Sequence, residues 1–104
     1  MNDRVVIVDA CRTAIGKMGG TLKNVNACDL ASALIKEFLD RYQCIADQID
    51  EVILGQCRQS SDESNVARVA SLKAGIPEKT PAFTVMRQCA SGMTAVHDAF
   101  LRIK

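Results

Sequence analysis

The feature that most constrains the fold of this chain is an alternation of short apolar runs with longer segments of helical periodicity. Three runs are rich in β-branched or aromatic residues: residues 5–10 (VVIVDA), 51–54 (EVIL) and 81–86 (PAFTVM). Such runs are typical of strands that are covered on both faces. Because consecutive parallel strands need a long crossover, we expect helices between the runs.

Three helical patterns occupy the segments between and after these runs. One extends from an Asn26 cap to about Gln43, a second ends before Gly75, and a third begins at about Cys89 or Ala90. The order is β-α-β-α-β-α. It predicts an α/β fold with right-handed crossovers and a mostly parallel sheet covered by helices.

Composition and charge exclude several classes of protein. The 104 residues are 48% hydrophobic and 24% charged, which is a globular composition. Thirteen Lys and Arg residues stand against twelve Asp and Glu without a basic tract, so we expect no nucleic-acid partner. No run approaches the ~18 apolar residues of a membrane span, and the start lacks the layout of a signal peptide. We therefore expect no membrane partner.

The cysteines indicate a reducing compartment. Their number is odd, no CxxC pair occurs, and no export signal is present, so we expect a cytoplasmic protein. With a single histidine and no paired ligand spacing, we expect no metal site. The cysteines are Cys11, Cys28, Cys44, Cys57 and Cys89.

Cys89 lies where the third apolar run meets the third helical pattern. In open α/β sheets, sites gather at the carboxyl ends of the strands, and the start of a helix stabilises a thiolate. Ala90, Ser91 and Gly92 would keep the first turn narrow, so that a substrate or another loop could approach the sulfur. Position alone leaves two equal alternatives, a nucleophile and a small buried hydrophobe. The other four cysteines are interpreted as structural or incidental.

A nucleophilic Cys89 needs a base, and His97 is the only histidine of this sequence. It lies eight residues further along the same helical pattern. That separation is ~12 Å along a regular helix, far beyond hydrogen-bond reach. If Cys89 is a nucleophile, its base must come from residues that this chain does not contain.

Two stretches resemble the thiolase family. They are the opening "VVIVDACRTAIGKMGGTLKNV" and the block "IDEVILGQCRQSSDESNVARVASLKAGIPEKTPAFTVMRQCASGMTAV" around Cys89. The resemblance covers essentially all 104 residues. It implies that residues 1–104 are a partial thiolase fold, the N-terminal part of the first of two similar halves, which ends within the helix after Cys89.

The resemblance also implies a function. Thiolases are acetyl-CoA C-acetyltransferases of fatty acid metabolism, which condense two acyl-CoA molecules or cleave a 3-ketoacyl-CoA with coenzyme A. By resemblance, Cys89 is the nucleophile that holds the acyl group as a thioester, and its backbone N–H is a candidate oxyanion donor. Ala90 and Gly92 would permit close packing. Coenzyme A and acyl-CoA are then substrates, no cofactor is permanently bound, and the residues that bind coenzyme A are not identified.

Two departures from the family pattern concern Met86, where asparagine is usual, and Ala14, where proline is usual. Met86 is expected to cost a polar contact near Cys89. The family's activating histidine, second cysteine and coenzyme A loop belong to later parts of a thiolase, so this segment alone is expected to be inactive. Its expected partners are the remaining C-terminal part of the thiolase and a second copy, in a homodimer or tetramer. That contact would use the edge of strand 81–86, if the strand order is 3-2-1.

Alternatives from other classes stay open at this point. The chain could be a noncatalytic thiolase-like assembly module, or one subunit of a split enzyme. A condensing enzyme of the ketosynthase type is disfavoured by the opening "RTAIG". A partner chain with Gly-His-Pro and Cys-Gly-Gly motifs would favour the enzyme, and its absence would favour the module.

Overall fold

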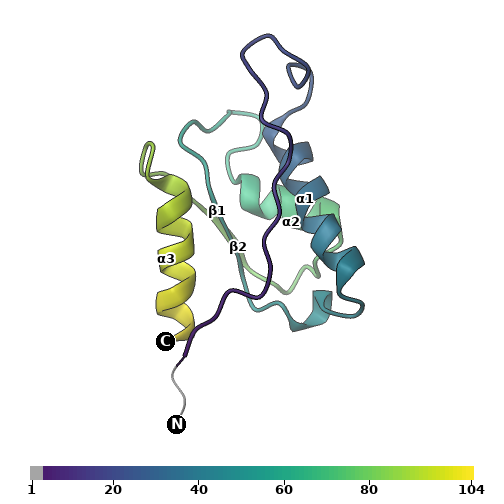
Figure 1. The fold of residues 1–104 in the computed structure, drawn as a ribbon, viewed down its shortest axis with the longest axis vertical. Coiled ribbons are helices and arrows are strands. Elements are labelled where there is room, and N and C mark those ends of the chain that lie inside the picture. The colour runs from purple at the N-terminus through teal and green to yellow at the C-terminus, as the bar shows by residue number, and fades with distance from the viewer. Residues whose placement is uncertain (1–3) are drawn as a thin grey trace.

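The computed structural model describes residues 4–104 as an α/β fold with a small parallel sheet between helices. Helix α3 covers one face of the sheet, α2 covers the other, and α1 lies against α2 (Figure 1). The predicted fold class is confirmed. The elements are α1 (Ala27–Arg41), the 3-10 helix η1 (Ala46–Gln48), β1 (Val52–Gly55), α2 (Val66–Ala74), β2 (Ala82–Val85) and α3 (Ser91–Ile103).

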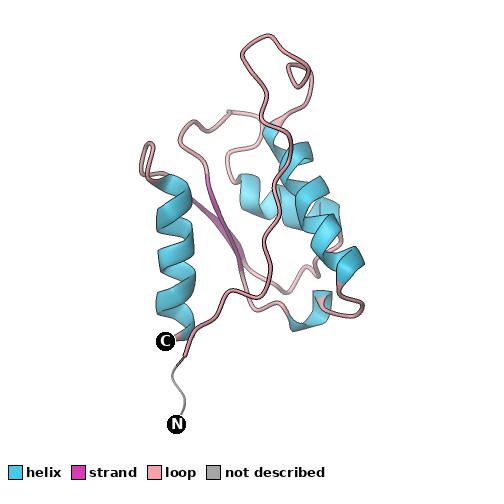
Figure 2. Cartoon of the chain, viewed as in Figure 1, coloured by secondary structure: helices cyan, strands magenta, loops and turns pink. Residues whose placement is uncertain are grey.

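The sheet pairs the second and third of the predicted strands. β1 and β2 run parallel, in a register that places Val52 beside Ala82 and Gly55 beside Val85. Figure 2 shows the two strands crossing the centre of the molecule between the helices. The carboxyl ends of both strands therefore lie at one edge of the sheet, where β2 leads into α3.

The predicted strand at residues 5–10 is wrong. Among the described residues this segment joins no sheet, and Val6, Ile7 and Val8 are 63%, 82% and 79% exposed. An apolar β-branched run indicates a preference for extended backbone, whereas a strand also needs a neighbour that supplies hydrogen bonds. A cavity of about 920 Å³, lined by Asp9 and by residues of α1, β1 and α3, lies beside β1 instead.

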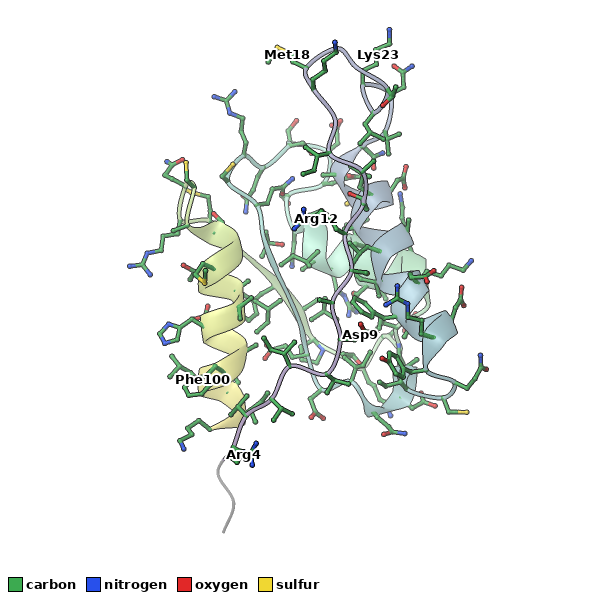
Figure 3. All side chains as sticks on the ribbon, in the orientation of Figure 1. Arg4, Asp9, Arg12, Met18, Lys23 and Phe100 are labelled. Carbon is green, nitrogen blue, oxygen red and sulfur yellow. The ribbon has the colours of Figure 1, made fainter. Side chains whose placement is uncertain are left out.

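Asp9 ties this N-terminal segment to the C-terminal end of α1. Its carboxylate accepts hydrogen bonds from the Tyr42 hydroxyl at 2.7 Å and from Arg41 Nη1 at 3.0 Å. Figure 3 labels Asp9 on the N-terminal segment. The Tyr42 hydroxyl, the Ala10 N–H and Arg41 hold the pKa of Asp9 below its ordinary value. Polar contacts therefore position the segment, and they weaken when the pH falls through that depressed pKa.

The caps of α1 and α2 follow the sequence. The Asn26 side chain accepts a hydrogen bond from Asp29 N–H at 2.8 Å, and Asn65 accepts one from Arg68 N–H at 3.3 Å. Helix α2 ends at Gly75, whose φ of 100° lies in the left-handed region that favours glycine. These local signals fix where both helices begin and where α2 ends.

Helix α2 forms the centre of the core. Its small side chains let α1 and the sheet approach closely, and Cys28 of α1 is fully buried against it. The buried residues of α2 are Val66, Ala67, Ala70, Ser71 and Ala74. Packing in this layer depends on small side chains, so additional volume there would have to displace a whole helix.

The end of β1 lies directly against the first turn of α3. A Cβ added at Gly55 would lie 2.5 Å from Gly92 N and Ser91 O and would overlap the Ser91 carbonyl carbon. At Gly92, an added Cβ would meet no atom of the described residues within 4 Å. Within the described residues the close contact is therefore made by Gly55 and not by Gly92, because only glycine at position 55 leaves room for the α3 backbone.

We predict opposite effects for alanine at these two glycines. Gly55→Ala should lower the free energy of unfolding by about 1–3 kcal/mol, because the added methyl group meets backbone that cannot rotate away. Gly92→Ala should raise it by about 0.5–1 kcal/mol, because Gly92 is helical and has open space around it. Urea denaturation followed by circular dichroism measures both, and equal effects of the two substitutions would contradict the close contact.

Candidate active site

The candidate site is the turn at residues 86–91, which leads from β2 into α3 at one end of α3 in Figure 1. Ala90 N–H donates to Arg87 O and Ser91 N–H donates to Gln88 O, both at 3.1 Å. Gln88 has a φ of 49°, which is uncommon for a residue other than glycine. Such a conformation costs on the order of 1–3 kcal/mol, so the surrounding hydrogen bonds must hold it.

Cys89 occupies the exposed part of this turn, one residue before the Ala90 cap of α3. Its backbone N–H has no hydrogen-bond acceptor within residues 4–104, although the neighbouring N–H groups are bonded. The start of a helix of 13 residues lies beside it, which favours negative charge. The turn thus places a thiol and an available N–H together at the carboxyl edge of the sheet.

Met86 supplies a contact that the sequence did not lead us to expect. Its sulfur accepts a hydrogen bond from Gln88 N–H at 3.5 Å. A thioether is a weak acceptor, but it satisfies the N–H of the strained residue beside Cys89. The turn therefore keeps a side-chain acceptor at position 86 although asparagine is absent.

Comparison with known proteins decides the family of this chain. A family model described as "Thiolase, N-terminal domain" matches residues 5–104. The chain belongs to the thiolase family. It is 45% identical over 103 residues to an acetyl-CoA acetyltransferase from Allochromatium vinosum, a match that covers 99% of this chain and 26% of that relative.

Other relatives agree with this family. The chain is 42% identical over 100 residues to a probable acetyl-CoA acyltransferase from Staphylococcus aureus, which covers 96% of this chain and 25% of the relative. The crystal structure of the Bacillus anthracis acetyl-CoA acetyltransferase matches with a TM-score of 0.78 and 44% identity, over 84% of this chain and 22% of that one. This thiolase chain spans about a quarter of the length of the relatives it matches.

The other cysteines of this thiolase chain differ in burial, and two of them are exposed as Cys89 is. Cys28 is completely buried, and burial, followed by a hydrogen bond with Glu63, raises the pKa of its thiol to about 11. Cys44 and Cys57 are exposed in loops, and Cys11 is half-buried in the N-terminal segment. Within residues 4–104, no group of three or more His, Cys, Asp or Glu side chains could hold a metal ion.

His97 lies on the exposed side of α3 and not at the turn. Its ring stacks on Phe100, with centroids 6.4 Å apart and planes inclined by 17°. Helix α3 is regular from Ser91 to Ile103, so the rise of ~12 Å between Cys89 and His97 stands. The structure does not bring the two candidate residues together.

None of the helices in the described residues is long and apolar enough to span a bilayer.

Sequence reasoning missed two residues that shape the turn, Gly55 and Ser91. Gly55 directly follows the apolar run 51–54, and a glycine at that place also marks close approach of another backbone. Ser91 was treated as one of three small residues. The residue is 3% exposed, and its hydroxyl accepts from Arg87 N–H and donates to Gln88 O, which no local pattern indicates.

We predict that the cysteines differ sharply in alkylation. In the folded chain at pH 8, iodoacetamide should modify the exposed Cys44, Cys57 and Cys89 first and leave Cys28 unmodified until the chain is denatured. A thiol with a pKa of about 11 is only about one part in a thousand ionised at pH 8, and the burial of Cys28 excludes the reagent as well. Peptide mass mapping measures this order, and native labelling of Cys28 as fast as Cys57 would contradict it.

Proposed function

We propose that this chain is the nucleophile-bearing segment of an acetyl-CoA C-acetyltransferase of fatty acid metabolism. The observation that carries the proposal is Cys89, an exposed thiol just before α3 with an available N–H. Family membership supports acyl transfer from coenzyme A thioesters, and relatives named acetyl-CoA acetyltransferases support acetyl-CoA as the substrate. Coenzyme A enters and leaves as a substrate, and the proposal needs no resident cofactor.

The proposed reaction is an exchange of one thioester for another. The Cys89 sulfur attacks the carbonyl carbon of acetyl-CoA, and the electron pair of the carbonyl π bond moves to oxygen. When this oxyanion collapses, the bond to the coenzyme A sulfur breaks and the acetyl group stays on Cys89. The proton lost by the Cys89 thiol ends on the coenzyme A thiolate, so that atoms and charge balance. Cys89 N–H is placed to donate to the transient oxyanion.

The complete reaction requires residues beyond this segment. His97 stacks on Phe100 on the exposed side of α3 and is too far along the helix to take the Cys89 proton. We propose that the remaining part of the thiolase supplies this base and the grip on coenzyme A, so that residues 1–104 alone have no thiolase activity. Loss of general acid–base help alone is typically worth ~10²–10⁴ in rate. The odd number of cysteines supports a cytoplasmic location.

We predict that Cys89 is the residue that becomes acetylated. The full-length protein is incubated with acetyl-CoA, quenched in acid and mapped by peptide mass, and the acetyl group should be found on Cys89. Cys89→Ser should lower turnover by several orders of magnitude, because a serine hydroxyl is not ionised by the same surroundings. Cys44→Ser, an exposed cysteine in the loop after α1, is the matched control and should retain activity.

Two outcomes would contradict this assignment. An acetyl group on another cysteine with Cys89 unmodified would move the nucleophile elsewhere. A full-length protein that takes up no acetyl group at all would favour the noncatalytic assembly module over the enzyme.

We further propose that the complete protein is a homodimer, or a dimer of such dimers, which pairs through the outer edge of β2. Val52 N–H donates to Pro81 O and Gln56 N–H donates to Val85 O, so these alternate residues of β2 face β1. Thr84 is out of phase with them, and its backbone groups point to the outer edge. Asn65 Nδ2 already donates to Ala82 O at this edge, at 3.2 Å, so the edge is open to another strand only from Thr84 onward.

We predict that Thr84→Pro weakens this pairing, whereas Thr84→Val does not. The Thr84 hydroxyl accepts from Ala67 N–H at 3.0 Å and donates to Asn65 Oδ1 at 2.8 Å, and both substitutions remove these bonds. Only proline also removes the backbone donor at the edge. Sedimentation velocity of the full-length protein at micromolar concentration should show assembly for Thr84→Val and dissociation for Thr84→Pro. Equal assembly of the two variants would rule out this edge.

A further inference from the structure

We propose that Ser91 is the positioning residue of the candidate active site, which holds the Cys89 N–H in the direction needed to bind the oxyanion. The inference rests on the proposed acyl transfer through Cys89 and adds to it a residue that touches no substrate. It follows from three observations on the turn at residues 86–91: the bonds of the Ser91 hydroxyl, the conformation of Gln88, and the contact with Gly55.

The Ser91 hydroxyl joins two backbone groups that lie before Cys89. Its oxygen accepts from Arg87 N–H at 2.8 Å, and its proton is donated to Gln88 O at 2.6 Å. This orientation is fixed, because an N–H can only donate and a carbonyl can only accept. The side chain is 3% exposed, so water does not compete for either bond.

These two bonds bracket the strained residue of the turn. Gln88 has a φ of 49°, and the peptide that joins Gln88 to Cys89 carries both the Gln88 carbonyl and the Cys89 N–H. Because the peptide is planar, a hydroxyl that fixes the direction of that carbonyl also fixes the opposite direction of the N–H. The same carbonyl also accepts from the Ser91 N–H at 3.1 Å. The hydroxyl adds the shorter bond, at 2.6 Å, and thereby holds the direction of the Cys89 N–H without contacting it.

Ser91 is itself anchored by the sheet. The backbone of β1 at Gly55 lies against the Ser91–Gly92 peptide so closely that no side chain fits between them. The contact with β1 therefore fixes the position of Ser91, and the Ser91 hydroxyl fixes the Gln88 carbonyl. The planar peptide then fixes the Cys89 N–H. A hydroxyl at position 91 is the only side-chain link in this series.

The test compares two reactions of Cys89 in the full-length protein. Acetylation by acetyl-CoA passes through an oxyanion, whereas alkylation by iodoacetamide displaces iodide at a methylene carbon and builds no oxyanion. Ser91→Ala should slow acetylation by about 10–100-fold, because loss of an oxyanion donor costs about 10²–10³ and a misplaced donor retains part of its effect. The KM for acetyl-CoA and the alkylation rate should change by less than about 3-fold, because Ser91 touches neither reagent.

Matched variants separate the hydroxyl from packing. Ser91→Thr keeps a hydroxyl and should acetylate at nearly the rate of the unmodified protein. Ser91→Val has the shape of threonine but no hydroxyl, and it should be as slow as Ser91→Ala. Ser71→Ala is the control for a lost buried serine, because the Ser71 hydroxyl donates to Arg68 O, three residues back, at 2.9 Å in α2. Ser71→Ala should leave both reactions of Cys89 unchanged.

Several results would overturn the inference. Acetylation of Ser91→Ala or Ser91→Val at the rate of the unmodified protein would do so, as would an equal loss of acetylation and alkylation. If neither variant folds, hydrogen exchange of the unmodified protein decides: a rapidly exchanging Arg87 amide would show that the Ser91 bond is not held. An unmodified protein without any acetyl group on Cys89 would instead overturn the proposed function, and this inference with it.

Discussion

The position of the candidate nucleophile depends on one contact, the approach of the Gly55 backbone to the Ser91–Gly92 peptide. Strand β1 is held by its parallel pairing with β2, and α3 packs on the same two strands. Gly55 lets the end of β1 reach the first turn of α3, so the distance of that turn from the sheet is fixed by direct backbone contact. A side chain at position 55 would push α3 outward and carry Cys89 with it. The turn at residues 86–91 is therefore supported by the rigid part of the molecule.

Within that support, the turn combines strain with hydrogen bonds. Gln88 adopts a left-handed conformation, and its N–H and carbonyl are bonded to Met86 Sδ and to the Ser91 hydroxyl. Strain of this kind persists only where neighbouring groups over-determine the backbone. The consequence is that Cys89, exposed at the next position, keeps an N–H without an acceptor in the described residues. The Cys89 thiol and the Cys89 N–H thus lie together before any substrate binds. A donor that is already oriented needs no reorganisation during acyl transfer.

Features that depend on neighbouring residues, such as helix ends, could be predicted from the sequence. Features that depend on contacts between distant segments of backbone could not. The Asn26 cap and the Gly75 stop were predicted because each acts within a few residues. Residues 5–10 failed because their composition does not specify a hydrogen-bonding neighbour. The place of Cys89 between a strand and a helix left a nucleophile and a buried hydrophobe as equal alternatives, and the resemblance to thiolases favoured the nucleophile. The roles of Gly55 and Ser91 could not, because they depend on an approach between segments some 35 residues apart in the chain.

The measurement that tests the central claim most directly is the structure of the full-length protein with an acetyl group trapped on Cys89. The turn should keep the left-handed Gln88 and the two Ser91 bonds, and the thioester oxygen should lie about 2.7–3.1 Å from Cys89 N. That result would place the donor where negative charge develops. An acetyl oxygen directed away from Cys89 N, with that N–H bonded elsewhere in the protein, would contradict the role assigned to this turn.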